Sequence, residues 1–124
     1  MAAEFDKFVR SELEPLIEEY RKQYGLHDLV PEVKWLLLRY DKNHYFDSHS
    51  DDSPGFVRRV SVVVYANDEY SGGDLVFDKL GITIKPKAGM VVVFPSSYTH
   101  SHASTPITDG VKYSLVNWYS FLGE

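Results

Sequence analysis

The stretch FVRRVSVVVYAN, residues 56–67, decides the fold because β-branched and aromatic residues fill it and turn residues surround it. Runs of the same kind, separated by Gly, Pro and Asp, continue through the chain: VKWLLLRY (33–40), DLVFD (74–78), ITIKP (82–86), GMVVVFP (89–95) and KYSLVNWYSF (112–121). Several short strands without alternating helices predict an antiparallel sandwich, jelly roll or small barrel.

The first 25 residues carry apolar side chains at helical spacing, and Gly25 is well placed to end a helix. Pro15 interrupts this pattern, since proline lacks the N–H that a helix interior needs. We therefore expect two short helices that cover one sheet.

Composition excludes several classes of function. A chain of 124 residues with 44% hydrophobic residues is expected to form one packed domain. Its formal net charge of −5 and lack of a long basic run argue against binding to a nucleic-acid backbone. Without cysteine, a metal must be held by His and carboxylate side chains.

The N-terminus resembles no targeting segment and no run is long enough to span a membrane, so we expect a soluble, cytoplasmic protein. The oligomeric state is not predicted.

The segment NHYFDSHSDDSPGF, residues 43–56, contains a candidate half of a metal site. On an extended chain His49 and Asp51 point to the same side, so imidazole and carboxylate can reach one ion. The segment YTHSHASTP, residues 98–106, offers His100 and His102 as a third ligand. Two His and one carboxylate form the facial triad that leaves positions open on iron(II).

A buried cation is predicted beside this metal. Lys112 and Ser114 share one face of the last strand, ten and twelve residues after His102. A lysine next to a metal suggests an anionic ligand. Tyr65 and Tyr40, each at the end of a predicted strand, are candidates for a phenol-lined pocket around it.

Taken in order, these motifs resemble the Fe(II)/2-oxoglutarate-dependent oxygenase superfamily, in its prolyl 4-hydroxylase-like branch. The resemblance runs from about residue 36 to the C-terminus and rests on four segments: YDKNHYFDSHSD (40–51), RRVSVVVYAN (58–67), SGGDLVF (71–77) and KAGMVVVFPS with HASTPITDGVKYSLVNW (87–118). It implies a double-stranded β-helix, or jelly roll, with the N-terminal helices on the larger sheet. The expected organisation is one domain over residues 1–124, with residues 1–32 as helical support and residues 33–124 as the jelly-roll core.

The resemblance also implies roles for single residues. By position, His49, Asp51 and His102 would bind the metal, and the spacing to Pro106 and Lys112 selects His102 over His100. Side chains that would bind 2-oxoglutarate are Lys112, Tyr65, Tyr40 and Ser114. Those that would contact substrate are Arg58 and Trp118. His27 and His44 are predicted not to be ligands.

The implied activity is a dioxygenase that uses Fe(II), 2-oxoglutarate and O2 to hydroxylate a C–H bond, with no side chain acting as general base. Peptidyl proline is the leading substrate, so the expected partner is a peptide or a small molecule. The alternatives are the same chemistry on a free amino acid, another side chain or a nucleobase. A cupin-like metal-binding module or a metal hydrolase comes last, because neither needs a buried cation at position 112.

Overall fold

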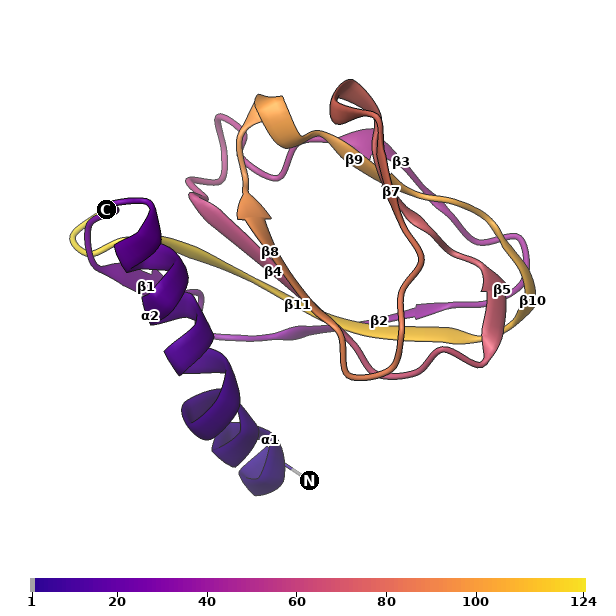
Figure 1. Ribbon diagram of the computed structural model, residues 1–124, viewed down its shortest axis with the longest axis horizontal. Coiled ribbons are helices and arrows are strands. Elements are labelled where there is room, and N and C mark those ends of the chain that lie inside the picture. Colours follow the sequence, from indigo (N-terminus) through magenta and orange to yellow (C-terminus); the bar gives the residue numbers. More distant parts are fainter. Residues whose placement is uncertain (1) are drawn as a thin grey trace.

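The structure is a computed structural model that describes residues 2–124. Two antiparallel sheets face each other, and the N-terminal helical segment lies outside the larger one (Figure 1). The larger sheet contains β1 (Leu29–Pro31), β2 (Leu36–Tyr40), β4 (Val60–Tyr65), β8 (Val91–Pro95) and β11 (Lys112–Phe121). The smaller sheet contains β3 (Phe46–His49), β6 (Leu75–Phe77), β7 (Ile82–Ile84) and β9 (His102–Ser104). A two-stranded ribbon of β5 (Tyr70–Gly72) and β10 (Ile107–Gly110) joins them at one end.

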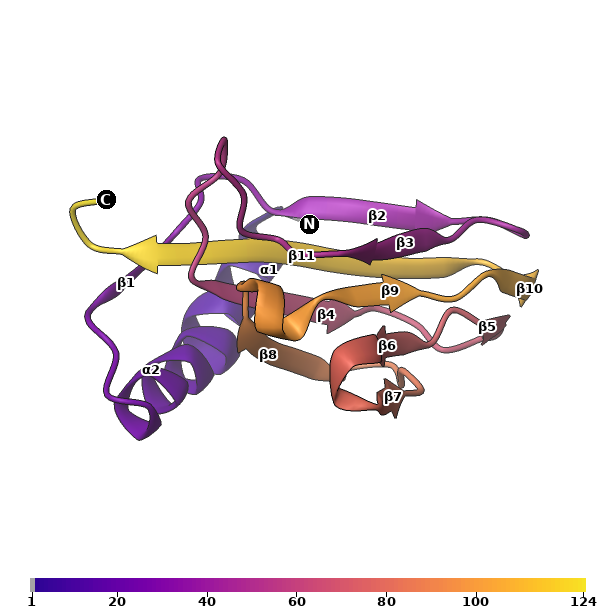
Figure 2. The ribbon, with the colours of Figure 1, turned by 90° about the horizontal axis from the view of Figure 1, so that it is seen from above.

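Strand β11 organises the larger sheet (Figure 2). It is ten residues long, and on one side it pairs first with β2 and then with β1. On its other side it pairs with β4, in a register that sets Ser114 opposite Tyr65 and Trp118 opposite Ser61. The side chains at alternate positions of β11 therefore point into the space between the sheets.

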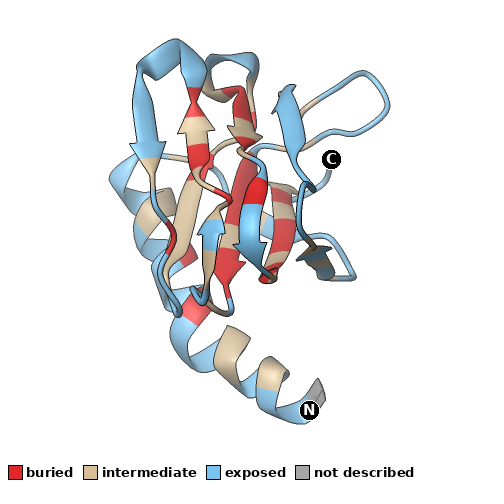
Figure 3. Ribbon diagram, turned by 90° about the vertical axis from the view of Figure 1, so that its right-hand side faces the viewer, coloured by how far each residue is buried: buried red, intermediate tan, exposed pale blue. Residues whose placement is uncertain are grey.

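Strand β4 is buried on both faces, which explains its nearly continuous apolar sequence. Val60, Val62 and Val64 pack with Leu13 and Ile17 of the helical segment. Alternate side chains of the strand face the other way, toward a second cluster between the sheets that consists of Leu75, Phe77 and Phe94. Figure 3 shows that the buried residues gather on the central strands.

The N-terminal segment consists of α1 (Ala2–Phe8) and α2 (Glu14–Gln23), joined directly by a π-helical turn (Val9–Leu13). The turn lies just before Pro15, where Glu14 donates its backbone N–H to the carbonyl of Val9. A wider turn of this kind lets the helix continue past a residue that has no N–H to donate. The two predicted helices are present, without a loop between them.

Gly25 follows α2 with a positive φ of 63°. The N–H of Leu26 bonds to the carbonyl of Arg21, and that of Gly25 bonds to the carbonyl of Lys22. This pair of bonds is the Schellman motif, in which a glycine without Cβ adopts the left-handed conformation at low cost. The predicted end of the helical segment is confirmed.

The predicted jelly roll with helices on its larger sheet is confirmed. The sequence did not identify several short strands, among them β1, which lies within the residues assigned to helical support. Strand β2 begins at Leu36, three residues later than the run that predicted it. No helix in the described part of the chain has the length and apolar character needed to cross a bilayer.

Candidate metal centre and adjoining cavity

The three predicted metal ligands meet where β3 pairs with β9. His49 ends β3 and His102 begins β9, and these two residues are direct partners in the antiparallel pair. Asp51 follows two residues after His49 and turns its carboxylate toward both rings. Its Oδ1 lies 3.2 Å from Nε2 of His49 and 3.5 Å from Nε2 of His102, and one ligand atom from each residue lies within 4.8 Å of the others.

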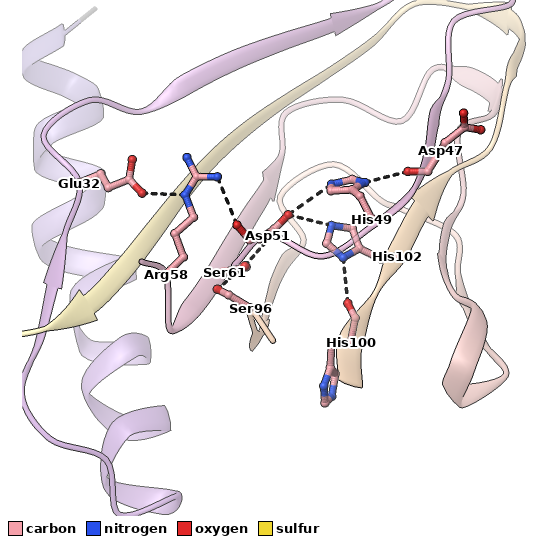
Figure 4. Close-up of polar contacts among 9 residues, drawn as sticks. All are labelled: Glu32, Asp47, His49, Asp51, Arg58, Ser61, Ser96, His100 and His102. Carbon is pink, nitrogen blue, oxygen red and sulfur yellow. Dashed lines mark hydrogen bonds and ion pairs between the residues drawn. The ribbon is translucent and has the colours of Figure 1, made fainter. Parts of the chain in front are cut away.

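Backbone carbonyls orient the two imidazoles (Figure 4). Nδ1 of His49 lies 2.7 Å from the carbonyl oxygen of Asp47, and Nδ1 of His102 lies 3.0 Å from that of His100. A carbonyl only accepts hydrogen bonds, so each Nδ1 carries the proton. With the proton held on Nδ1, Nε2 of each ring faces the centre and is the atom that can bind a metal.

Asp51 is held as a carboxylate. Burial by itself would raise its pKa, but hydrogen bonds from His49, Ser61 and Trp118, together with the charge of His102, lower the pKa of Asp51 to about 2. Ser61 Oγ donates a bond of 2.6 Å to Oδ2, which leaves Oδ1 to face the two rings. The hydrogen bond to Asp51 raises the pKa of His49, whereas burial lowers the pKa of His102.

The other three histidines lie elsewhere. His100 belongs to the 3-10 turn Tyr98–His100, its ring bonds to Thr99, and it points away from the centre (Figure 4). The ring of His27 packs edge-on against Phe121, and Nδ1 of His44 accepts the N–H of Asp41. The structure therefore brings together His49, Asp51 and His102 and leaves the remaining imidazoles outside.

A cavity of about 340 Å³ extends from this centre between the two sheets. Every residue that the sequence proposed for the site lines it, from both sheets and from the loop before β4: His49, Asp51, His102, Lys112, Tyr65, Tyr40, Ser114, Arg58 and Trp118. Lys112, Ser114 and Trp118 reach it from alternate positions of β11, and Ser61 and Tyr65 reach it from alternate positions of β4.

Lys112 is a buried cation without a carboxylate partner. Its side chain is 3% exposed, and Nζ donates to the carbonyl of Gly73 at 3.1 Å and to Ser104 Oγ at 2.9 Å. Within residues 2–124 no carboxylate lies within ion-pair distance of it. Burial lowers the pKa of Lys112 to about 8, although the charge of Asp74 opposes the shift. Such a charge is costly to bury alone, so this end of the cavity suits an anion.

Glycine at position 73 allows the close approach of Lys112. Gly73 has a positive φ of 67°, and a Cβ there would lie 3.1 Å from Cδ of Lys112 and 2.6 Å from Cδ1 of Ile107. The second glycine of the Gly-Gly motif thus leaves room for the aliphatic part of the Lys112 side chain.

Phenols surround the ammonium. The Lys112 Nζ lies 4.7 Å from the ring centroid of Tyr40 and 5.4 Å from that of Tyr65. Burial, with smaller contributions from Tyr70 and Tyr40, raises the pKa of Tyr65 far above its usual value, and burial also raises the pKa of Tyr40. Both side chains remain protonated and can donate hydrogen bonds to an anion. The buried Ser114 lies beside Tyr65 in the sheet.

The wall near the metal centre is formed by Arg58 and Trp118. The guanidinium carbon of Arg58 lies 3.6 Å from the ring centroid of Trp118. Its Nε donates to Oε2 of Glu32 at 2.9 Å, and Nη1 lies 3.5 Å from the carbonyl oxygen of Asp51 (Figure 4). Arg58 is therefore fixed in place, and its charge is already paired.

Comparisons with known proteins identify the family of the chain. The family model described as the 2OG-Fe(II) oxygenase superfamily matches residues 35–120. A PKHD-type hydroxylase of Burkholderia ambifaria is 37% identical over 98 residues, which cover 70% of this chain and 42% of that protein. The chain spans about half the length of the curated relatives it matches.

Solved structures share the fold. A viral collagen prolyl hydroxylase from Paramecium Bursaria Chlorella virus-1, in complex with 2OG, has a TM-score of 0.72 at 23% identity and covers 89% of this chain and 71% of its own. A prolyl hydroxylase from Trichoplax adhaerens, in complex with a hypoxia inducible factor peptide fragment, has a TM-score of 0.76 at 21% identity and covers 91% of this chain and 55% of its own. The chain belongs to the 2OG-Fe(II) oxygenase superfamily.

The donor set fits the cofactors of that family. Two imidazole Nε2 atoms and a carboxylate oxygen converge on one point, which is the donor set that suits iron(II). The buried Lys112 offers the opposite charge to a dicarboxylate that reaches across the cavity.

Sequence reasoning missed two parts of the site. One is Glu32, which pairs with Arg58, and the other is Ser96, whose hydroxyl lies 2.8 Å from that of Ser61. The partners are 26 and 35 residues apart, so only the pairing of distant segments brings them together. Ser61 shares a face of β4 with Tyr65, but alternation along one strand cannot reveal a partner on another strand.

Proposed function

We propose that the chain is an Fe(II)- and 2-oxoglutarate-dependent dioxygenase that hydroxylates a C–H bond, with peptidyl proline as the leading substrate. One observation carries the proposal: His49, Asp51 and His102 open into the same cavity as the buried Lys112. A hydrolase or a simple metal-binding module has no use for an unpaired ammonium at that position.

In this proposal His49, Asp51 and His102 hold the metal. The backbone carbonyls of Asp47 and His100 hold a proton on each Nδ1, so that Nε2 of both imidazoles would bind the ion. The bound iron and 2-oxoglutarate supply the oxidising chemistry, in which O2 is consumed, succinate and CO2 are released and a C–H bond of the substrate is hydroxylated. No side chain of the chain needs to take or give a proton in this reaction.

The cosubstrate would bind with its distal carboxylate at Lys112. Nζ now donates to two neutral oxygens, and a carboxylate is a stronger acceptor for the same protons. The hydroxyls of Tyr65, Tyr40 and Ser114 would complete the shell of donors. Because these groups are buried, water competes weakly with them and the charge-assisted bonds are strong.

The mouth of the cavity favours a peptide over a free amino acid. A free amino acid brings a carboxylate of its own and needs a second available cation, but Arg58 already pairs with Glu32 at 2.9 Å. The ring of Trp118 and the exposed Phe56 and Phe46 offer apolar surface that suits an uncharged residue within a chain. The relatives support the same choice, since the solved structures include a collagen prolyl hydroxylase and a hydroxylase with a bound peptide.

We further propose that residues 1–124 act as one oxygenase domain, in which residues 1–32 support the jelly roll of residues 33–124. The packing of Leu13 and Ile17 against β4 supports this arrangement, because β4 also carries Ser61 and Tyr65 to the cavity. Loss of the helical support would therefore disturb the site as well as the fold.

The proposal is tested by succinate release from 2-oxoglutarate in the presence of Fe(II), with proline-containing peptides, free amino acids and nucleotides compared in parallel. We expect stimulation by a peptide and a mass gain of one oxygen in that peptide. If only a free amino acid or a nucleotide stimulates succinate release, the dioxygenase assignment stands and the proposed peptide substrate is wrong. Failure to turn over 2-oxoglutarate under every condition would contradict the enzyme.

A further inference from the structure

The hydroxyls of Ser96 and Ser61 form a short hydrogen-bonded chain that ends at Asp51 (Figure 4). Ser61 Oγ lies 2.6 Å from Oδ2 of Asp51 and 2.8 Å from Oγ of Ser96. Both serines are 1% exposed, so bulk water does not compete for these bonds. A buried hydroxyl beside a carboxylate has few other partners to choose.

The chemistry of the three groups fixes which of them donates each hydrogen bond. A carboxylate can only accept, so the single proton of Ser61 points at Oδ2. The oxygen of Ser61 is then free only as an acceptor, and the bond between the two serines must be donated by Ser96. Donation by Ser96 polarises Ser61 and strengthens the bond that Ser61 gives to Asp51.

The backbone holds Ser96 in position to start this chain. Its N–H donates to the carbonyl of Arg59, which comes just before β4, and its carbonyl accepts the N–H of Asp52, which comes just after the metal-binding segment. Ser96 thus joins the end of β8 to the two segments that carry Ser61 and Asp51. The fold therefore fixes the Ser96 hydroxyl, the first donor in this series of hydrogen bonds, whether or not a metal is bound.

We infer that Ser61, supported by Ser96, is a positioning residue that makes Asp51 a one-oxygen ligand. Because Oδ2 of Asp51 accepts the hydrogen bond from Ser61, it turns away from the centre. Oδ1 alone faces His49 and His102. A carboxylate that uses one oxygen leaves one more coordination position open than a carboxylate that uses both. The inference rests on the proposed function, since it assigns a task within that metal site.

The test is the titration of metal-free protein with Co(II), a redox-stable probe, followed by its visible absorption. In the wild type we expect one ion per chain. Ser61→Ala should weaken binding by roughly tenfold to a hundredfold, the usual effect of removing a group that orients a metal ligand. At saturation its spectrum should differ from that of the wild type, because the freed carboxylate can bind through both oxygens.

Three further variants separate positioning from a general loss of stability. Ser61→Thr keeps the hydroxyl and should restore affinity and spectrum to near the wild type. Ser96→Ala removes only the support and should weaken binding by about threefold to tenfold. If Ser61→Ala fails to fold, Ser96→Ala still tests the positioning role. Ser97→Ala, at a neighbouring serine that bonds to Thr99 and not to Ser61, is the matched control and should bind as the wild type does.

The outcomes are distinct from those that test the function. One Co(II) per wild-type chain, with wild-type affinity and spectrum in Ser61→Ala and Ser96→Ala, would overturn the positioning role and leave the metal site standing. The positioning role is also overturned if Ser61→Ala lowers the melting temperature but leaves the saturated spectrum unchanged. A wild type that binds no Co(II) would overturn the metal site, and with it both proposals.

Discussion

The charged groups at the two ends of the cavity are compensated in opposite ways. At the metal end, Asp51 has hydrogen bonds and neighbouring positive charge, and backbone carbonyls orient both imidazoles. At the other end, Lys112 is buried among neutral oxygens and phenols, and its pKa is lowered accordingly. One end is assembled before any ligand arrives, whereas the other carries a charge that only a ligand can pair.

This difference predicts which substitutions affect metal binding and which affect the cosubstrate. Loss of any one of the three metal ligands should remove activity, because the remaining two would hold the ion too weakly. Changes at the lysine end should lower the affinity for 2-oxoglutarate in proportion to the hydrogen bonds removed. They should leave metal affinity unchanged.

The largest effect is expected from His102→Ala. Removing one of three ligands should reduce metal affinity and 2-oxoglutarate turnover to background, a loss of roughly a thousandfold or more in rate. Metal titration and succinate release measure the two effects. His100→Ala is the matched control, since the orienting group is the carbonyl of residue 100, which alanine keeps. Loss of activity in His100→Ala together with normal activity in His102→Ala would reverse the assignment.

At the other end, Lys112→Ala should raise the apparent KM for 2-oxoglutarate by roughly tenfold to a thousandfold, or about 1.5 to 4 kcal/mol of charge-assisted bonding. Metal affinity should remain as in the wild type. Lys112→Arg should recover part of the loss, since a guanidinium keeps the charge but not its place. An unchanged KM in Lys112→Ala would show that the distal carboxylate lies elsewhere.

The lowered pKa of Lys112 predicts a dependence on pH. The ammonium of the free protein loses its proton as pH rises through about 8, so 2-oxoglutarate affinity should fall above that value. The expected decrease is about tenfold between pH 7 and 9, because affinity follows the charged fraction of the lysine. Calorimetric binding to the metal-loaded protein measures it. Lys112→Arg should abolish the dependence, and its persistence there would assign it to another group.

The smallest effect is expected from Tyr65→Phe. It removes one hydroxyl that would donate to the distal carboxylate, at a cost of about 1 kcal/mol, which raises the 2-oxoglutarate dissociation constant by about fivefold. The ring stays, so the fold and metal affinity should not change. A loss as large as that of Lys112→Ala would mean that the phenol, and not the ammonium, dominates at this end.

Local rules explain what the sequence could predict. His49 and Asp51 share a side because extended chains alternate, and the same rule places Lys112 and Ser114 together on β11. Gly25 ended the helical segment as expected because a left-handed residue after a helix favours glycine. Each of these inferences needs only residues that are close in the chain.

Contacts between distant segments could not be predicted in the same way. The bond of Ser96 to Ser61 depends on how β8 pairs with β4, and that of Arg58 to Glu32 depends on where the chain enters β2. The short strands β5 and β10 pair through a shifted register, which a pattern of alternating residues does not reveal. Registers of this kind are set by the whole sheet.

A single ligand that spans both ends of the cavity would join the metal to Lys112. Calorimetry on metal-loaded wild type and Lys112→Ala, with 2-oxoglutarate, 2-oxobutyrate and glutarate, tests this directly. 2-Oxobutyrate keeps the group that reaches the metal and lacks the distal carboxylate, and glutarate has both carboxylates without the oxo group.

We expect 2-oxoglutarate to bind the wild type more tightly than either analogue. In Lys112→Ala its advantage over 2-oxobutyrate should shrink by roughly tenfold to a thousandfold, while its advantage over glutarate remains. If 2-oxoglutarate keeps its full advantage over 2-oxobutyrate without the lysine, Lys112 does not bind the distal carboxylate and the spanning ligand is contradicted.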